Sequence, residues 1–509
     1  MSEKFLDAFH QASNFTLTEN NAVARATTNS ALLDFFAQGG AMRKRSEAEI
    51  ASEFDKAFCE DRLLATKLAF YIRDVRDGLG ERRTFRIILR HLAKVAPEIV
   101  IKNLELIPHY GRWDDLYALF DTQIEKEAGK LMAKQLARDI ESDKPSLLAK
   151  WLKSENASSK ETKRLARKTQ RLLGLPPSIY RKVLSDLRKK IKVVERDMSL
   201  NNWNKINYSA VPSKASLIYK NAFMKHDPER YLEYINKLKS GEEKINASTL
   251  YPYELVREAY KDIYKTSGGL SQHERDIINS QWEALPDYIG EKTENSIAVV
   301  DTSGSMVGLP IQVALSVGLY LAERNKGPYH NKFITFSTRP QLITVRGSTF
   351  IDKVRNMIAD GSDWEMNTDI EAVFDLILKV AIENHLKQDE IPKKIYIISD
   401  MEFDEATKNF NHGKFVGFLN FSPIAVKKTL FMQIQERFET HGYEMPQLVF
   451  WNVDARNKQF PMSLDERGFQ LVSGCSPSIF EHTIKGEFLN PYDFMLSILN
   501  SERYEDIRV

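Results

Sequence analysis

The sequence predicts a multidomain protein, with an all-α helical solenoid in its first part and a doubly wound α/β domain in its second. From about residue 5 to about residue 282, apolar residues recur at steps of three and four, which is typical of helices that bury one face. After Asn295 the pattern changes to short, continuous apolar runs that alternate with helical stretches, as in a parallel sheet. A chain of 509 residues is also too long for one ordinary hydrophobic core. We therefore expect two domains, residues 1–290 and residues 291–509.

Within residues 1–290 the pattern indicates paired antiparallel helices. One helix is expected to end at the glycine-containing turn 77–80, and the next to stop before Pro97. Further helices are expected at residues 98–106, 113–120, 124–140, 160–173 and 177–194. Because a pair of this size cannot cover its own apolar face, we expect the pairs to stack as an α-solenoid. No clean sequence repeat is present, so an irregular helical bundle is the alternative.

The α/β part contains six apolar runs with the length of strands. They lie at residues 296–300, 332–336, 341–345, 394–399, 448–453 and 469–472, and helices are expected at 311–324, 350–358, 370–385, 423–441 and 490–500. Only four residues join the strands at 332–336 and 341–345, too few for a parallel crossover. These two strands are therefore expected to form an antiparallel hairpin at a sheet edge, which Pro340 suits because proline lacks a backbone donor.

Composition narrows the class of protein without identifying a partner. The formal net charge is only +2 at pH 7, so whole-chain charge favours no particular partner. The two cysteines, Cys59 and Cys475, have neither zinc-site nor disulfide-framework spacing, which fits a reducing compartment. The chain shows no signal-peptide pattern and no apolar stretch long enough to cross a bilayer. We therefore expect a cytoplasmic protein that does not enter a membrane.

Oxygen-bearing side chains follow two of the predicted buried strands and precede a helix. The first strand ends in D-x-S-x-S, which presents Asp301, Ser303 and Ser305 on one turn. Asp400 follows the strand at 394–399, and Thr368 precedes the helix at 370–385. Ligands bind at the carboxyl ends of parallel strands, and carboxylate and hydroxyl oxygens match Mg²⁺, Mn²⁺ or Ca²⁺. The sequence therefore predicts a divalent-cation site with an open coordination position.

This constellation resembles the metal-ion-dependent adhesion site of von Willebrand factor A domains. The resemblance implies that all five residues are direct or water-mediated ligands and that an acidic group of a partner protein takes the vacant position. The alternative is that D-T-S-G-S-M is only a serine-rich cap of the next helix. Catalysis is a further alternative, but the chain lacks a P-loop, an H-E-x-x-H motif and a G-x-S-x-G elbow, so we expect a binding protein and not an enzyme.

Positive charge is concentrated between Lys150 and Arg196, where fifteen basic and four acidic residues give a net charge of +11. Six of the basic residues recur every three or four positions and share one face of a helix: Lys160, Lys163, Arg164, Arg167, Lys168 and Arg171. Such like charges repel, so a polyanion such as RNA would stabilise them. A solvated helix whose charges meet acids from elsewhere in the fold is an equally good explanation.

A second basic cluster is the turn R-D-V-R-D-G-L-G-E-R-R at residues 73–83. Its glycines permit a tight turn, and the following helix N-terminus could supply amide donors to a phosphate. An ordinary helix–helix turn with Asp–Arg pairs explains the same residues.

Together with I-P-H-Y-G-R-W-D-D-L, L-A-K-W-L-K-S-E-N and V-P-S-K-A, this turn ahead of an A-type domain resembles the Ro/TROVE family. The resemblance implies a monomeric ring in which HEAT-like helices close through the A-type domain and structured RNA binds the basic surface. It gives nine candidate RNA contacts: Arg73, Arg76, Arg82, Arg83, Arg164, Arg167, Lys168, Arg171 and Lys214. We expect an RNA-binding protein of Ro type with Mg²⁺ at the adhesion site. The alternatives are a protein–protein scaffold that acts through the A-type domain and a metal-dependent nuclease.

Overall fold

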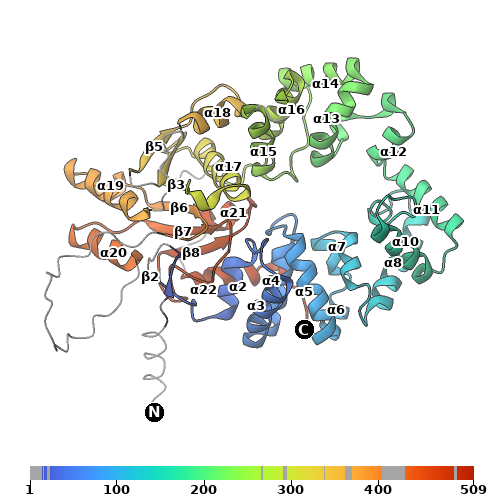
Figure 1. The fold of residues 1–509 in the computed structure, drawn as a ribbon, viewed down its shortest axis with the longest axis horizontal. Coiled ribbons are helices and arrows are strands. Elements are labelled where there is room, and N and C mark those ends of the chain that lie inside the picture. Colours follow the sequence, from blue (N-terminus) through green and yellow to red (C-terminus); the bar gives the residue numbers. More distant parts are fainter. Residues whose placement is uncertain are drawn as a thin grey trace, which may run out of the picture. The chain divides into compact units, whose positions relative to one another are not determined.

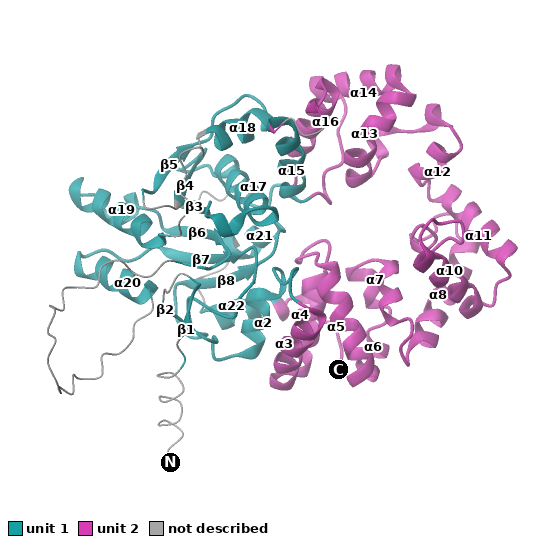
Figure 2. Ribbon diagram, in the orientation of Figure 1, with its two compact units in different colours: residues 1–45, 251–263, 287–498 teal, residues 46–250, 264–286, 499–509 magenta. Residues whose placement is uncertain are grey.

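The computed structural model describes residues 14, 16–19, 23–264, 268–290, 295–336, 339–360, 369–403, 430–485 and 490–509. Helices dominate the first half of the chain and a mixed α/β sheet region follows (Figure 1), so the predicted fold class is confirmed at this level. The chain divides into two compact units (Figure 2). Unit 1 comprises Met1–Arg45, Tyr251–Ile263 and Asp287–Ile498, and unit 2 comprises Ser46–Leu250, Tyr264–Pro286 and Leu499–Val509. The predicted division at residue 290 lies near the start of the long segment of unit 1.

Unit 1 is built around a six-stranded sheet in the order β5-β4-β3-β6-β7-β8. Its strands are β3 (Ser296–Asp301), β4 (Lys332–Phe336), β5 (Gln341–Thr344), β6 (Lys394–Ser399), β7 (Gln447–Asn452) and β8 (Phe469–Ser473). The pairs β3–β4, β3–β6, β6–β7 and β7–β8 are parallel. β5 runs antiparallel to β4 at the edge, so the predicted hairpin is confirmed.

Helices cover both faces of this sheet. α17 (Leu309–Arg324) and α21 (Ile479–Lys485) lie on one face, and α19 (Ile370–Glu383) and α20 (Leu430–Thr440) lie on the other. Two consecutive residues of β7 face opposite layers. The Phe450 ring lies 4.7 Å from Phe431 of α20, whereas the Trp451 ring lies 5.0 Å from Phe480 of α21. Because both faces are buried, these strands read as continuous apolar runs instead of alternating ones.

The first described residues of the chain also belong to unit 1. β1 (Thr16–Leu17) pairs with β2 (Val23–Ala24), and α2 (Ala31–Gly39) lies beside β8. The Gly40 amide donates to Ser473 Oγ at 3.0 Å, and a Cβ on Gly40 would lie 2.6 Å from the Ser473 carbonyl oxygen. Other elements of this unit are α15 (Pro252–Ile263), η5 (Gly304–Met306), α18 (Phe350–Asp360), η7 (Gln388–Glu390) and α22 (Pro491–Leu499).

Unit 2 consists of helices. They are α3 (Glu47–Glu60), α4 (Arg62–Arg73), α5 (Arg82–Val95), α6 (Pro97–Lys102), α7 (Leu106–Tyr110), η1 (Trp113–Leu119), α8 (Glu125–Glu141), α9 (Leu148–Trp151), α10 (Lys160–Leu173), α11 (Pro177–Lys190), α12 (Val194–Ser199), η2 (Trp203–Lys205), η3 (Tyr208–Ala210), α13 (Ser213–His226), α14 (Pro228–Ser240), α16 (Gln272–Glu283) and η8 (Glu502–Tyr504). The helix predicted at 113–120 is a 3-10 helix. The helix predicted at 98–106 is divided by a turn, because α6 ends at Lys102 and α7 begins at Leu106, and the helix predicted at 177–194 ends at Lys190. The helices predicted at 124–140 and 160–173 are α8 and α10.

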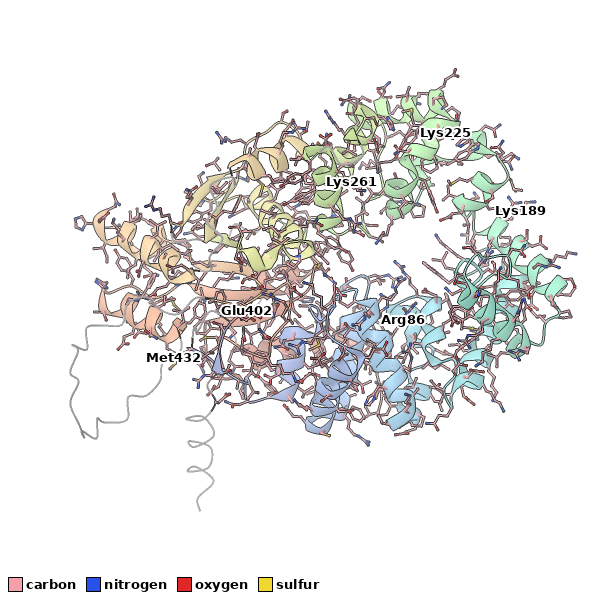
Figure 3. The ribbon with its side chains drawn as sticks, viewed as in Figure 1. Arg86, Lys189, Lys225, Lys261, Glu402 and Met432 are labelled. Carbon is pink, nitrogen blue, oxygen red and sulfur yellow. The ribbon has the colours of Figure 1, made fainter. Side chains whose placement is uncertain are left out.

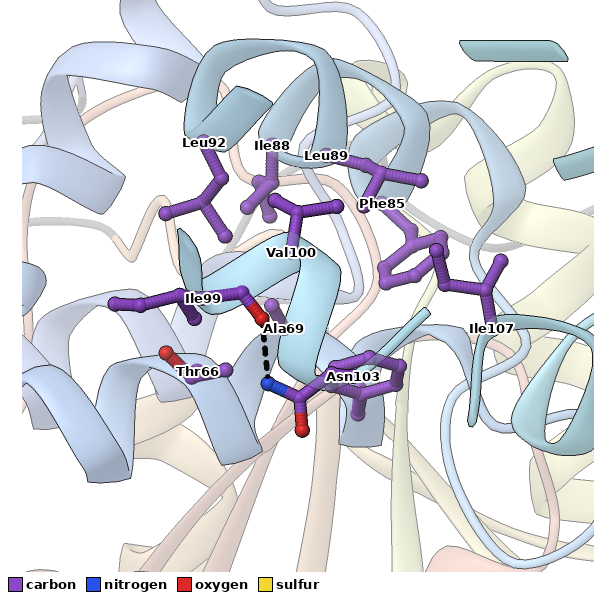
Figure 4. Close-up of a pocket in the computed structure, with 11 residues that line it drawn as sticks. Thr66, Ala69, Phe85, Ile88, Leu89, Leu92, Ile99, Val100, Asn103 and Ile107 are labelled. Atoms are coloured by element: carbon purple, nitrogen blue, oxygen red, sulfur yellow. Dashed lines mark hydrogen bonds between the residues drawn. The ribbon is translucent and has the colours of Figure 1, made fainter. Parts of the chain in front are cut away.

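Apolar side chains of successive helices form the cores of unit 2. Between α4, α5 and α6 they leave only a small apolar pocket (Figure 4), which Asn103 closes by donating from Nδ2 to the Ile99 carbonyl oxygen at 2.8 Å. A second cluster, which includes Phe223, Tyr231 and Ile277, joins η2, η3, α13, α14 and α16. None of the described helices is long and apolar enough to span a bilayer.

Candidate functional site

The two predicted carboxylate ligands lie at the same edge of the sheet. Asp301 is the last residue of β3, and Asp400 follows β6 directly. β3 and β6 are parallel neighbours with Val300 opposite Ile398, so their carboxyl ends meet. The polar cluster formed by Asp301, Ser303, Ser305 and Asp400 is called here the strand-end cluster.

Asp301 is fully buried, with 0% of its surface exposed. Its Oδ2 accepts a hydrogen bond from Ser399 Oγ at 2.6 Å, and its Oδ1 accepts one from the Ser303 amide at 2.9 Å. Burial, and then the charge of Asp400, raise the pKa of Asp301 to about 7, although the hydrogen bonds from Ser399 and Ser303 oppose that shift. Two neighbouring carboxylates in a dry environment are therefore not balanced by their own hydrogen bonds, and a cation would stabilise their ionised form.

The two serine hydroxyls of D-x-S-x-S lie side by side. Ser303 Oγ and Ser305 Oγ are 2.9 Å apart, and the Ser305 hydroxyl also hydrogen-bonds to Asp400. Thr368 lies outside the described residues. Its neighbour Asp369 caps α19 by accepting a hydrogen bond from the Ala372 amide at 2.9 Å, so that carboxylate already has a structural role.

Arg456, which follows β7, forms an ion pair with Asp400 through Nη2. Burial raises the pKa of Asp400, while hydrogen bonds from Ser305 and Arg456 and the charge of Arg456 lower it. The guanidinium of Arg456 also lies 3.8 Å from Glu19 Oε2. A permanent positive charge therefore already stands beside one carboxylate of the strand-end cluster.

Glu402, which Figure 3 labels, lies two residues beyond Asp400, and its amide donates to Asp400 Oδ1 at 3.3 Å. Its side chain is buried, its Oε2 accepts from the Glu19 amide at 2.8 Å, and its Oε1 accepts from Asn457 Nδ2 at 2.9 Å. The same Asn457 amide donates to Glu19 Oε1 at 2.8 Å. The segment that carries Glu19 thus packs beside the strand-end cluster.

Sequence reasoning missed Ser399, Glu402, Arg456 and Glu19. The run I-I-S-D-M-E-F contains a signal for the first two, because Ser399 and Glu402 flank a carboxylate at a strand end. Glu19 lies 383 residues before Glu402 and Arg456 lies 56 residues after Asp400, so no local pattern connects either of them to the site.

The donor set of the strand-end cluster fits a hard divalent cation. Carboxylate and hydroxyl oxygens suit Mg²⁺, which also keeps several waters in its coordination shell. Across the described part of the chain, no group of three or more His, Cys, Asp or Glu side chains could hold a metal ion. A cation at this edge would therefore rely on two carboxylates, the serine hydroxyls and water.

The predicted RNA contacts divide into two groups. Arg73 is 1% exposed and donates from Nε to Asp115 Oδ2 at 2.7 Å, so its guanidinium is inside the helical core. Arg76 donates from Nη1 to the His109 carbonyl oxygen at 2.8 Å. Arg164 pairs with Asp121 and Glu161, and Lys168 pairs with Asp121 and Glu125. For Arg164 and Lys168, the explanation in which basic side chains meet acids of the same fold therefore applies.

Seven members of the predicted set are exposed: Arg76, Arg82, Arg83, Arg164, Arg167, Arg171 and Lys214. Among the described residues, neither Arg167 nor Arg171 has a side-chain hydrogen bond or ion pair. A groove of about 720 Å³ in unit 2 is lined by four basic and two acidic side chains, which are Lys150, Arg181, Arg188, Arg196, Glu155 and Glu195. Arg188 is held in place by the carbonyl oxygens of Ala149 and Leu152 at 2.9 Å each. The basic segment thus keeps a positive face and a groove despite its internal ion pairs.

Comparison with known proteins overturns the resemblance to the Ro/TROVE family. The first half matches the family described as a domain of unknown function (DUF2828), over residues 18–173 and 145–294, and the second half matches the domain of unknown function (DUF7788), over residues 295–496. The chain is also 30% identical, over 528 residues, to "Uncharacterized protein L728" of Acanthamoeba polyphaga mimivirus, an alignment that covers 96% of this chain and 87% of that relative.

Local packing explains why the motif at residues 73–83 suggested the wrong family. Asp74 is buried and accepts from Arg503, and a Cβ on Gly78 would lie 2.2 Å from the Tyr71 carbonyl oxygen. The turn at residues 73–83 therefore reflects the requirements of a tight helix–helix connection, which unrelated helical proteins share. The chain belongs to the family defined by these two domains, DUF2828 followed by DUF7788.

Proposed function

We propose that this protein binds RNA through the basic face of unit 2, and that unit 1 holds a divalent cation that receives an acidic group of a protein partner. The observation that carries RNA binding is the face of α10 that presents Arg167 and Arg171, which are both exposed and, among the described residues, have no ion pair. The groove that contains Lys150, Arg181, Arg188 and Arg196 adds positive charge to unit 2. Binding of a phosphate backbone to such a surface releases condensed counterions, which makes basic grooves favourable sites for RNA. Recognition would rest on shape and phosphates, because no RNP-type aromatic signature is present.

The proposal includes a finer description of the fold. We infer that unit 1 is doubly wound in the manner of von Willebrand factor A domains and that unit 2 stacks HEAT-like helix pairs. Parallel strands with helices on both faces support the first inference. The packing of α3, α4 and α5 on one another supports the second.

Cation binding is proposed for the strand-end cluster. Asp301, Ser303, Ser305 and Asp400 would hold Mg²⁺, with Thr368 as the predicted ligand from the preceding loop. When bound, the cation would offset the two carboxylate charges and attract an acidic side chain. The burial of Asp301 beside Asp400 supports this assignment, because a bound cation would offset the cost of keeping both carboxylates ionised.

A specific observation also favours a scaffold role for unit 1. Val307, two residues beyond Ser305, is 70% exposed although it is apolar. Singly exposed apolar side chains are common on protein surfaces, so Val307 bears on the scaffold role through its position, where a partner bound at the strand-end cluster would cover it. Under this second candidate function, partner binding at the strand-end cluster is the main activity of the protein.

The test of RNA binding is a salt series with labelled structured RNA. We expect the logarithm of the association constant to fall linearly with the logarithm of salt concentration, with a slope that grows by about 0.7 to 0.9 for each phosphate contacted. The double variant Arg167→Glu/Arg171→Glu should bind at least about tenfold more weakly and show a shallower slope. A control variant with the same charge change, Lys126→Glu/Lys225→Glu, should bind like the wild type. Equal loss in both variants, or no binding by the wild type, would remove the proposal.

A further inference from the structure

Unit 2 gathers basic side chains from four separate segments around the adjacent carboxylates of Asp114 and Asp115. The segments are the end of α4, the first two turns of α5, the residue before η1, and α9 with the residues that follow it. We call this group the Arg112 cluster, and its basic members are Arg73, Arg82, Arg86, Arg112, Lys150 and Lys153. Figure 3 labels one of them, Arg86.

Two arginines already use the carboxylates of this cluster. Asp115 accepts from Arg73 Nε and Arg86 Nε, both at 2.7 Å, and from the Arg112 backbone amide at 2.9 Å. Asp114 Oδ2 lies 2.8 Å from Arg86 Nη2. Asp115 is completely buried, so its hydrogen bonds to these donors leave no free side for another cation.

The next two cations rest on aromatic rings. The Arg112 guanidinium lies 4.8 Å from the centre of the Trp151 ring, and Lys153 Nζ lies 5.2 Å from the centre of the Tyr117 ring. Among the described residues, no carboxylate is within ion-pair distance of Arg112 or Lys153. Both side chains are partly buried, so they have lost part of their hydration, and the charge of Asp114 acts on them without a direct ion pair.

Further positive charge surrounds this pair. Burial lowers the pKa of Arg112, and the charges of Arg73 and Arg82 lower it further, while the charges of Asp114 and Asp115 oppose the shift. Burial also lowers the pKa of Lys153; the charge of Asp114 opposes this shift, and the charges of Arg86 and Arg82 add to it. Lys150 Nζ lies 5.9 Å from the centre of the Trp151 ring, the ring that the Arg112 guanidinium also contacts. The cluster therefore holds six basic side chains, whereas the carboxylates of this region are those of Asp114, Asp115 and the buried Glu81, which precedes Arg82.

The chemistry of the cluster selects the kind of anion. A planar guanidinium matches two oxygens of a phosphate, and an ammonium group adds a compact charge. The site also lies at the beginning of α5, where the positive end of the helix dipole favours an anion; the N-cap residue Glu81 makes no side-chain hydrogen bond to that end. A compact dianion compensates the excess charge better than one phosphodiester does.

We propose that Arg82, Arg112 and Lys153 form a binding site for a phosphate monoester. Lys150 belongs both to the Arg112 cluster and to the basic groove, so a phosphate bound here is continuous with the groove. The inference that this phosphate is carried by an RNA terminus rests on the proposed RNA binding. A free nucleoside monophosphate or inorganic phosphate offers the same chemistry.

The test compares oligoribonucleotides of one sequence that carry either a 5′-phosphate or a 5′-hydroxyl. We expect the phosphorylated form to bind about tenfold more tightly, and inorganic phosphate to compete for that advantage. The variant Arg82→Gln/Lys153→Met should lose the preference while it keeps the affinity for the 5′-hydroxyl form within about threefold. Lys126→Met serves as the control, and it should retain the preference.

Thermal unfolding supplies a second measurement that does not depend on RNA. Inorganic phosphate and adenosine monophosphate should raise the Tm of the wild type and of Lys126→Met, but not that of Arg82→Gln/Lys153→Met. In phosphate-free buffer, Lys153→Met should unfold at the same temperature as the wild type or higher, because it removes an uncompensated charge. Stabilisation by these ligands without RNA binding would keep the phosphate site and reject its RNA source. If RNA binds equally well with a 5′-phosphate or a 5′-hydroxyl, and free phosphates do not raise the Tm, the phosphate site is refuted. The proposed function is then unaffected.

Discussion

Arg503 holds Asp74, 429 residues earlier in the chain, in a two-point ion pair: Nε donates to Oδ2 at 2.5 Å and Nη2 donates to Oδ1 at 2.8 Å. Asp74 is fully buried and also accepts from Tyr504 Oη at 3.2 Å. Tyr504 in turn stacks on Tyr110, with ring centres 5.5 Å apart. Residues at the end of the chain thus complete the core of unit 2.

Arg503→Ala should destabilise unit 2 by about 2–3 kcal/mol, because it leaves a buried carboxylate without its counter-charge. Urea unfolding followed by circular dichroism measures this loss. Arg508→Ala is the control, since Arg508 is largely exposed and its ion pair with Asp506 is long, at 3.9 Å; we expect less than about 0.5 kcal/mol there. Similar losses in the two variants would show that the buried pair has no special contribution.

Asp301→Asn should abolish Mg²⁺ binding without unfolding the protein. Asparagine keeps the size of the side chain and can accept the Ser303 amide bond, but it brings no charge to the cation. We expect Mg²⁺ to raise the Tm of the wild type and not that of the variant. Asp369→Asn is the matched control. It weakens the cap of α19, with a loss of at most about 1 kcal/mol, and should retain the response to Mg²⁺. An equal response to Mg²⁺ in Asp301→Asn and the wild type would refute the ligand assignment.

Arg456→Met should strengthen Mg²⁺ binding by about three- to tenfold, which corresponds to about 1 kcal/mol. The guanidinium occupies Asp400 and repels a second cation, so its removal frees that carboxylate. Arg456→Lys keeps the charge and is expected to change the affinity much less. Isothermal titration with Mg²⁺ distinguishes the two variants, and weaker binding in Arg456→Met would mean that Arg456 supports the metal site instead of competing with it.

Gly78→Ala should destabilise unit 2 by about 2–3 kcal/mol, because the added Cβ would lie 2.2 Å from the Tyr71 carbonyl oxygen and the backbone must move. Gly174→Ala separates this clash from conformational strain. Gly174 has a φ of 65° with no atom near its virtual Cβ, so only the left-handed backbone opposes alanine there, at about 1 kcal/mol. The difference between the two midpoints of urea unfolding measures the steric effect, and equal midpoints would argue against it.

The sequence predicted the parts of the fold that depend on local pattern. Continuous apolar runs identified the buried strands, the four-residue connection identified the β4–β5 hairpin, and the shared edge of parallel strands brought Asp301 and Asp400 together. The acid partners of the basic helix were not predictable in this way. Asp121, which pairs with Arg164, lies 43 residues before it, and periodicity shows that a face is polar without showing what meets it.

The family assignment was the weakest inference from the sequence, because it depended on helical motifs whose residues are required for local packing. Gly78 and Asp74 are required by a tight turn and a buried ion pair, respectively, and such requirements recur in unrelated helical proteins. Glu19 and Arg456 show a second limit of prediction from sequence, which concerns contacts between residues that are far apart in the chain. Their places beside Asp400 depend on contacts between distant segments, which no short window of sequence contains.

The division of the chain has a consequence for biosynthesis. During translation, the segment with α2 emerges long before β8, the strand beside which it packs, and unit 2 lacks Arg503 and Tyr504 until residues 499–509 have been made. Neither unit can therefore finish folding while the middle of the chain is still being synthesised. For the same reason, no single proteolytic cut separates the polypeptide into two self-sufficient pieces, since each piece would leave part of its core on the other.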